Sequence, residues 1–552
     1  MTQHSCRRQR HDGPALSADP GIRAADLTAG LAPTASPLAE QPPPASGATT
    51  LRPAADREAG RGRVHVIDKV VSGIRWSVLD QGVQQVVRLV VVVVLTRLLS
   101  PSEFGLMNMA WVAVLLLSLV YGLGLVEALI QRQDVTERHV AVAFTATTAM
   151  GILIAASTAA SSGLIAGFFR QPGLQPVLAC LSLVVVFQGL EAVPNEMLRK
   201  GLHFRDCVIS NTIGTVIGAA VALVCGFAGA GVWSLVGLAL TESVVAAALG
   251  WWLAIRARVW RPALSTDWRA LGDLVGFSAY VTGQQAFWYT QNNADNLIVG
   301  RVLGATALGL YGLAYRVLLY PLQRFTAVLT TIGLPLFSTL SSDRARLREA
   351  FLTALRYAAL VSFPVTLGAA LVAPEFISVI FGEQWLPAVT TMQILALNGP
   401  RLALKRLFGD VYQAVGKPEW DFWSTGLTLV AYIPAFLIGV RHGIVGVAVG
   451  LTVAGYLVAP LDLRLAAAAV DGRIGEVLRA VLPPSLATLA MVLVVLVGRQ
   501  LLPDDGWLAL RLTCLVAAGA VAYAAGLRVF APGLLSGALH AARRRPAGTS
   551  PE

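Results

Sequence analysis

Charged residues are scarce in this chain, and their scarcity excludes a soluble domain. Only 14% of its 552 residues are Asp, Glu, Lys or Arg, whereas 55% are hydrophobic, and the mean hydropathy is +0.64. A typical soluble domain carries about 25% charged residues. The formal net charge of +11 does not indicate nucleic-acid binding either. The surplus Lys and Arg lie between apolar runs, where membrane proteins carry the charges that set their orientation.

Cysteine and histidine are also few, and they are scattered along the chain. No C-x-x-C pair occurs among the five cysteines, so neither a disulfide framework nor a cysteine metal site is predicted. His139, His203 and His442 fall in expected short loops, without a second ligand at the spacing of a metal site. We therefore predict no metal and no cofactor.

The first 63 residues contain no aromatic residue and no apolar run. They are rich in Pro, Ala, Gly, Arg and Asp, and such a segment cannot bury enough surface to offset its ordering entropy. We expect a disordered cytoplasmic tail here, and not a secretory signal peptide, because the apolar core of a signal peptide is missing. An over-predicted start upstream of about Val64 is the alternative explanation.

What the chain has instead of charge is a series of apolar runs from about Val78 to Phe530. Each is roughly 20 residues long, the length that crosses a hydrocarbon core. The fold class is therefore all-α, a polytopic membrane protein of about 14 transmembrane helices. The expected helices are 78–96, 105–130, 140–168, 174–197, 208–228, 232–255, 272–299, 306–334, 352–379, 388–414, 421–440, 444–466, 481–501 and 508–530.

The basic residues favour alternate connectors between these helices. Connectors such as 199–205, 256–269 and 344–348 are basic, whereas 226–231 and 382–387 contain no Lys or Arg. Because cytoplasmic loops carry the excess of Lys and Arg, this pattern predicts a cytoplasmic (inner) membrane protein with both termini in the cytoplasm.

One short pattern, R-[LV]-L followed by [FL]-G-L and A-[WY], occurs twice with identical spacing, over 97–111 and 301–315. Six expected helices separate the copies, so the two halves are parallel repeats, an organisation typical of transporters. Arg97 and Arg301 end the first helix of each half, where we expect structural roles. The predicted division is a tail (1–63), an N-lobe (64–260), a C-lobe (261–470), two trailing helices (471–532) and a basic cytoplasmic tail (533–552).

Several motifs in order resemble those of Wzx-type polysaccharide exporters. They include Leu95-Thr96-Arg97-Leu98-Leu99-Ser100-Pro101, Leu198-Arg199-Lys200-Gly201-Leu202-His203-Phe204, Asn296-Leu297-Ile298-Val299-Gly300-Arg301, Phe381-Gly382-x-x-Trp385 and Ala414-x-Gly416-Lys417-Pro418. The resemblance runs from about Val70 to Leu465. These exporters form the polysaccharide-transport branch of the multidrug/oligosaccharidyl-lipid/polysaccharide exporter superfamily.

The resemblance implies a flippase that moves a polyprenyl-pyrophosphate-linked oligosaccharide across the cytoplasmic membrane, for lipopolysaccharide or exopolysaccharide biosynthesis. It implies alternating access, in which two lobes rock around a central cavity. The expected partners are the lipid-linked oligosaccharide and membrane lipid, and not nucleic acid. A polymerase and a chain-length regulator are partners that the resemblance leaves open.

Ionisable residues within a span are costly, so each is a candidate for function. Because a guanidinium can donate paired hydrogen bonds to phosphate oxygens, the basic ones are candidates for binding the pyrophosphate. They are Arg88, Arg316, Arg324, Arg401 and Lys405. For Arg316 and Arg324 the alternative is a side chain that reaches the lipid interface, and for Arg88 it is a structural role.

Acidic residues are fewer within the spans. Asp295 lies in the polar stretch 291–296, which we expect to line a water-filled cavity. Asp295 and Glu242 are the candidates for coupling transport to a proton or sodium ion, and pairing with a nearby arginine is their alternative role.

Three other functions are alternatives to polysaccharide export. A multidrug exporter of the same superfamily carries cations and needs an acidic cavity, whereas the embedded surplus here is basic. A peptidoglycan lipid-precursor flippase shares the lipid anchor of the cargo, so charge does not distinguish it. A membrane glycosyltransferase or polymerase needs a positioned acid and base, and usually a sizeable outer loop. The sequence offers neither, so we predict a transporter and not an enzyme.

Overall fold

The computed structural model describes residues 76, 80–118, 136–502 and 507–532, which all belong to one unit, His65–Glu552. Within α8 it leaves out the side chains of 268–292, 320, 321, 324, 325, 327, 328 and 332. Both predicted tails, 1–63 and 533–552, and residues 119–130 of the second predicted helix lie outside the described residues. The described residues form helices and contain no strand.

Helices occur at all fourteen predicted positions, with ends shifted by several residues. The first is Asp80–Leu98. The others are α2 (Pro101–Ser118), α4 (Glu137–Phe169), α5 (Leu174–Lys200), α6 (Phe204–Phe227), α7 (Val232–Arg256), α8 (Trp268–Leu340), α9 (Arg344–Leu371), α10 (Ala373–Ile380), α11 (Val389–Ala414), α12 (Pro418–Gly439), α13 (Gly443–Ala469), α14 (Ile474–Leu501) and α15 (Leu508–Phe530). Two short 3-10 helices, η1 (Glu383–Ala388) and η2 (Val440–His442), complete the set.

Helix α8 contains two of the predicted helices. Its backbone leaves helical geometry at Gly304, with φ 85° and ψ −175°, a conformation open essentially to glycine alone. The break falls between the predicted helices 272–299 and 306–334. A single glycine therefore replaces the expected connector.

Eleven described segments are long and apolar enough to cross a membrane, one of them being α12 and α13 together. Helix α11 is not among them, because it carries Arg401, Lys405, Arg406 and Asp410. The chain is thus a multi-pass membrane protein. Two of the predicted candidates, Arg401 and Lys405, lie on the more polar helix α11.

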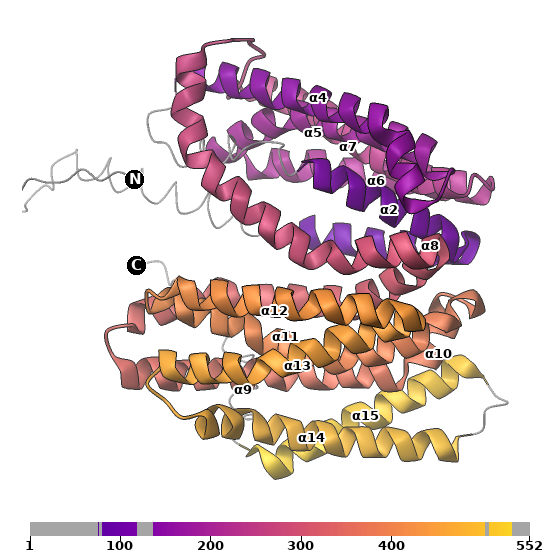
Figure 1. Ribbon diagram of the computed structural model, residues 1–552, viewed down its shortest axis with the longest axis vertical. Coiled ribbons are helices and arrows are strands. Elements are labelled where there is room, and N and C mark those ends of the chain that lie inside the picture. Colours follow the sequence, from indigo (N-terminus) through magenta and orange to yellow (C-terminus); the bar gives the residue numbers. More distant parts are fainter. Residues whose placement is uncertain (1–75, 77–79, 119–135, 503–506, 533–552) are drawn as a thin grey trace, which may run out of the picture. The chain divides into compact units, whose positions relative to one another are not determined.

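The helices gather into two groups, which Figure 1 shows in purple and in orange. In one, α4 packs on α5, α6 on α7, and α5 on α7; in the other, α11 packs on both α9 and α13, and α12 on α13. Helices α14 and α15 pack on each other, and α14 also packs on α9. Helix α2 packs on α8. The predicted lobe boundaries themselves stay predictions.

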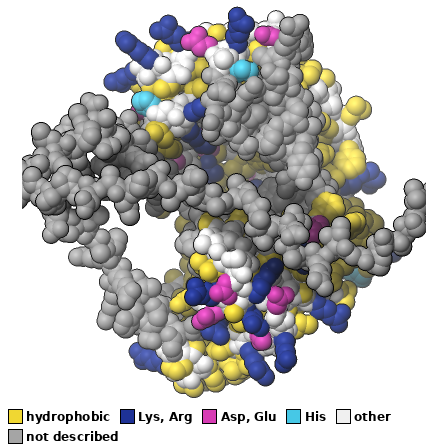
Figure 2. Space-filling view, turned by 90° about the vertical axis from the view of Figure 1, so that its left-hand side faces the viewer, with side chains coloured by type: hydrophobic (Ala, Val, Ile, Leu, Met, Phe, Trp, Pro, Cys, Tyr) yellow, Lys and Arg dark blue, Asp and Glu magenta, His cyan; other side chains and the backbone are white. Residues whose placement is uncertain are grey.

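Exposed basic residues gather at the ends of alternate helices, with single ones such as Arg170 and Arg441 at other ends. Figure 2 shows Lys and Arg side chains spread over one face, with fewer Asp and Glu. Those exposed at or just after the ends of α5, α7, α8, α11 and α13 include Arg199, Lys200, Arg256, Arg258, Arg344, Lys417 and Arg473. The direction in which the chain crosses the membrane stays a prediction.

Candidate functional site

The two copies of the repeated pattern contact each other where α2 crosses α8. A Cβ atom on Gly105 would overlap the carbonyl oxygen of Ala305, and one on Gly309 would overlap that of Pro101. Ala305 and Gly309 follow Pro101 and Gly105 by the same number of positions, so one contact is made twice, as at a two-fold interface. Small residues are what allow membrane helices to approach so closely.

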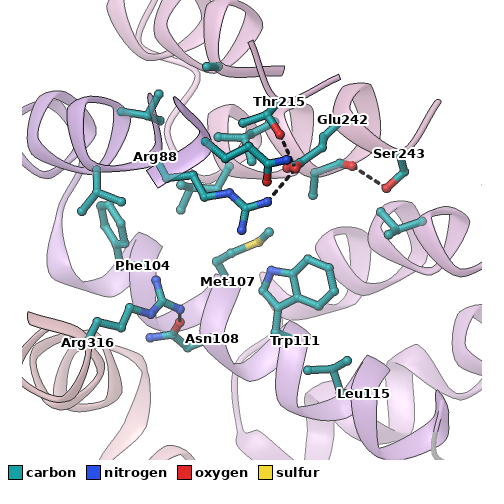
Figure 3. Close-up of a pocket in the computed structure, with 18 of the residues that line it drawn as sticks. Arg88, Phe104, Met107, Asn108, Trp111, Leu115, Thr215, Glu242, Ser243 and Arg316 are labelled. Atoms are coloured by element: carbon teal, nitrogen blue, oxygen red, sulfur yellow. Dashed lines mark hydrogen bonds and ion pairs between the residues drawn. The ribbon is translucent and has the colours of Figure 1, made fainter. Parts of the chain in front are cut away.

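A cavity of about 890 Å³ lies beside this crossing. Its wall comes from the helix Asp80–Leu98, α2, α5, α6, α7 and α8, so both copies of the repeat contribute to it. Figure 3 shows part of its lining as sticks, with Arg88, Trp111 and Arg316 labelled. We refer to it as the central cavity.

Arg88 enters the central cavity from the first helix. Its Nη2 atom lies 2.8 Å from Oε1 of Glu242 on α7, and the hydroxyl of Thr215 on α6 donates to the same oxygen at 2.8 Å. The Arg88 side chain is 55% exposed. Its charge is therefore paired, but the guanidinium still borders open space.

Arg316 enters the cavity from α8, directly after the second copy of the pattern. Its Nη2 atom donates to Oδ1 of Asn108 on α2. Asn108 is buried and lies against Gly312, one turn beyond the glycine crossing. Two arginines, one from each half of the chain, thus line one cavity (Figure 3).

Most of the remaining polar wall is neutral. Seven amide side chains line it, Gln84, Asn108, Gln188, Asn211, Asn293, Asn296 and Gln323. Each amide both donates and accepts hydrogen bonds, which suits a surface rich in hydroxyl groups. The polar stretch predicted to line a cavity contributes Asn293 and Asn296.

The two acidic candidates lie in different places. Glu242 lines the central cavity, as does Glu191 on α5. Asp295 is 4% exposed, is not part of the wall, and accepts hydrogen bonds from the Tyr311 hydroxyl at 2.7 Å and from the Asn296 backbone at 2.8 Å. Across the described part of the chain, no three His, Cys, Asp or Glu side chains gather as metal ligands would.

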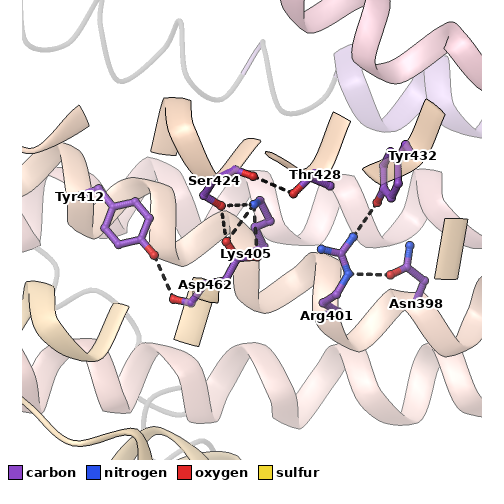
Figure 4. A network of polar contacts seen from close by, with 8 residues as sticks. All are labelled: Asn398, Arg401, Lys405, Tyr412, Ser424, Thr428, Tyr432 and Asp462. Atoms are coloured by element: carbon purple, nitrogen blue, oxygen red, sulfur yellow. Dashed lines mark hydrogen bonds and ion pairs between the residues drawn. The ribbon is translucent and has the colours of Figure 1, made fainter. Parts of the chain in front are cut away.

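Arg401 lies away from the central cavity. It borders a second cavity of about 330 Å³ between α9, α11, α13 and α14. Only 7% exposed, it donates from Nε to Oδ1 of Asn398 and from Nη2 to the hydroxyl of Tyr432, both at 2.8 Å. Its guanidinium is therefore held within one group of helices (Figure 4).

Lys405 borders the same second cavity and is bound by a carboxylate. Its Nζ atom lies 3.1 and 3.2 Å from the two carboxylate oxygens of Asp462 on α13 and 2.7 Å from the hydroxyl of Ser424 on α12. The Asp462 side chain is 4% exposed. Figure 4 shows this buried pair one turn along α11 from Arg401.

The structure thus separates the candidates. Arg88, Arg316 and Glu242 meet in the central cavity, whereas Arg401 and Lys405 lie in the second one. The side chain of Arg324 lies outside the described residues. The roles of all seven candidates in binding or coupling stay predictions.

Sequence reasoning did not single out Asn108, Thr215 or the rings of Trp111 and Tyr315 as cavity residues. For the two rings a signal existed, because both end the repeated pattern. Asn108 and Thr215 are uncharged, and nothing in a single sequence separates them from the many polar residues that face neighbouring helices.

Further contacts join the two groups of helices next to the glycine crossing. The Trp385 indole N–H donates to the Thr96 carbonyl at 2.8 Å, and the Trp385 ring packs edge-on against Phe104. Arg97 donates from Nε to the Ile380 carbonyl at 3.1 Å. Arg97 thus binds carbonyls at the end of α10, while Arg301 lies over the Phe168 ring, and neither lines the central or the second cavity.

The comparisons with known proteins agree with the resemblance. Residues 94–390 match the family described as polysaccharide biosynthesis protein. The teichuronic acid biosynthesis protein TuaB of Bacillus subtilis (strain 168) is 26% identical over 67% of this chain and 77% of its own length. The lipopolysaccharide biosynthesis protein WzxC of Escherichia coli (strain K12) is 26% identical over 69% of this chain and 78% of its own length.

Among solved structures, the lipid II flippase MurJ in an inward closed conformation has the same fold. The TM-score is 0.67, and the match covers 84% of this chain and 100% of that chain at 15% identity. At this identity the likeness describes the fold alone. Since the family match spans more than half of the sequence, the chain belongs to the polysaccharide biosynthesis protein family.

Proposed function

We propose that this protein is a flippase that moves a polyprenyl-pyrophosphate-linked oligosaccharide across the cytoplasmic membrane, for lipopolysaccharide or exopolysaccharide biosynthesis. The observation that carries the proposal is the central cavity. It is built by both repeats, and it receives one arginine from each, Arg88 and Arg316, among seven amide side chains. The family and the MurJ-like fold support the same reading.

Different side chains of the cavity suit different parts of this cargo. The guanidinium groups bind the pyrophosphate, because their planar forks match its oxygens. The amides replace the water around the sugar hydroxyls, and the polyprenyl chain stays in the lipid. The contacts of Thr96 and Arg97 with Trp385 and α10 join the two groups of helices, and alternating access requires such contacts to separate.

The wall of the cavity weighs against a multidrug exporter. It contains Arg88 and Arg316 beside Glu191 and Glu242, and one of the two acids is already paired with Arg88. A cationic drug would meet no net negative charge there. A peptidoglycan-precursor flippase has the same anchor chemistry, and the test for it is rescue of cells depleted of their own lipid II flippase. We infer that the protein transports its cargo and does not catalyse a reaction on it.

The location follows from the proposal. The protein resides in the cytoplasmic membrane with both termini in the cytoplasm, where its cargo is assembled, and a polymerase and chain-length regulator act on the exported product. We expect that proteases cleave a C-terminal tag only after the cells are opened. Cleavage of the tag on intact cells would contradict this orientation.

The experiment uses cells that lack the gene and express Arg88→Gln, Arg316→Gln or the control Arg346→Gln. Arg346 is exposed at the start of α9, and its side chain is 76% exposed. We expect the first two variants to insert normally, to lose surface polysaccharide, and to accumulate lipid-linked oligosaccharide in the inner leaflet. Normal polymer output from both would overturn the proposal.

A further inference from the structure

The wall of the central cavity contains two aromatic rings that the repeat relates. Trp111 ends the first copy of the pattern and Tyr315 ends the second, at equivalent positions. Both side chains are half-buried, packed against the hydrophobic core on one side, and both line the cavity. They are thus one feature that occurs twice, and not two unrelated residues.

The glycine crossing determines where the two rings lie. Helices α2 and α8 touch at Gly105 and Gly309, and again one turn on at Asn108 and Gly312. Trp111 and Tyr315 each lie three residues beyond that second contact, which is one further helical turn. In Figure 3 the Trp111 ring borders the same open space as the side chains of Arg88 and Arg316.

The chemistry of the surrounding wall indicates what these rings contact. Amide side chains and guanidinium groups form hydrogen bonds to hydroxyl and phosphate oxygens, but they leave the apolar C–H faces of a sugar ring without a partner. A Trp or Tyr face is flat, apolar and slightly negative, and so attracts C–H groups. Leu or Val would pack against the core equally well but would not offer such a face.

We propose that Trp111 and Tyr315 form a carbohydrate-stacking pair, one ring from each repeat, that binds a pyranose ring of the cargo by its apolar faces. This rests on the proposed function, and it names the part of the cavity that recognises the sugar. The two rings distinguish a sugar-bearing lipid from the bare polyprenyl pyrophosphate, which the arginines bind alone. Because the rings belong to different repeats, a sugar held between them also links the two halves.

The test measures binding of the full chain in lipid nanodiscs to two probes. One is the lipid-linked oligosaccharide extracted from cells that lack the gene, and the other is undecaprenyl pyrophosphate. The variants are Trp111→Leu and Tyr315→Leu, with Trp111→Phe and Tyr315→Phe to retain a ring. Trp423→Leu is the control, because Trp423 on α12 is 70% exposed and lines neither cavity.

We expect the double leucine variant to bind the oligosaccharide lipid about tenfold more weakly and the bare pyrophosphate unchanged, since two ring faces are lost. The phenylalanine variants and the control should stay within about twofold of the wild type. If the leucine pair does not fold, the methionine pair Trp111→Met with Tyr315→Met replaces it.

The stacking pair would be overturned if the double leucine variant bound the oligosaccharide lipid as tightly as the wild type does. It would also be overturned if the variant lost the same affinity for both probes. A loss of affinity for the oligosaccharide lipid in the phenylalanine pair as large as that in the leucine pair would also overturn it. Failure of the proposed function looks different, because then the wild type itself binds neither probe. The two failures are therefore separable in one experiment.

Discussion

Gly105 on α2 and Ala305 on α8 touch backbone to backbone, 200 positions apart in the sequence. The equivalent pair, Gly309 and Pro101, repeats the contact. A methyl group at Gly105 would meet the main chain of the facing helix, and main chain cannot rotate away as a flexible side chain can.

We therefore predict that Gly105→Ala lowers the free energy of unfolding by about 1–3 kcal/mol, the usual cost of overpacking. Gly167→Ala on α4 is the matched control, since nothing lies within 4 Å of a Cβ atom there. The control should be neutral or slightly stabilising, because alanine favours a helix more than glycine does. Thermal unfolding in detergent measures both, and equal midpoints would show that the crossing is looser than described.

A charge exchange separates two roles for Arg88. If Arg88 only pairs with Glu242, the double variant Arg88→Glu with Glu242→Arg restores the contact and restores export. If Arg88 binds the pyrophosphate, the exchange restores stability but not export, because the cation then comes from α7. We predict the second outcome. Each single variant should change the free energy of unfolding by less than about 1 kcal/mol, as the Arg88 side chain is half exposed. Export of polymer and thermal unfolding are measured side by side.

The sequence predicted the fold well because a bilayer imposes simple rules. The apolar runs are set by membrane thickness, so all fourteen helices could be placed. Their connections were harder. Gly304 replaces a whole loop, and the predicted helix 352–379 is divided at Val372 into the end of α9 and α10. Both depend on backbone geometry, which apolar periodicity does not report.

The site was predictable only in part. The cost of charge inside a membrane indicates Arg88, Arg316 and Glu242 as candidates, and these three share one cavity. The same rule also indicates Arg401 and Lys405, which lie in another cavity. Charge alone does not say which way a helix faces, and the partner of Lys405, Asp462, is 57 positions away in the sequence.

The buried pair of Lys405 and Asp462 gives a prediction for the second cavity. Asp462→Asn should lower the free energy of unfolding by about 3–5 kcal/mol, because it leaves the ammonium group buried without its carboxylate. The double variant Lys405→Met with Asp462→Leu should recover most of the loss, since similar apolar side chains replace buried pairs well. We expect it to export polymer normally. A stable double variant without export would instead assign Lys405 to cargo binding.

A last prediction concerns Glu375 on α10, which joins the trailing helices to the rest of the protein. Its Oε1 atom lies 3.3 Å from Nε of Arg499 on α14 and 3.5 Å from Nε of Arg511 on α15, and the carboxylate is 4% exposed. Glu375→Gln removes the charge that two arginines share, so we expect a loss of about 3 kcal/mol in the free energy of unfolding. Glu383→Gln on η1 is the control, because Glu383 is exposed. Polymer export should fall only as far as the amount of folded protein falls. Equal unfolding midpoints for the two variants would mean that apolar packing alone holds α14 and α15 in place.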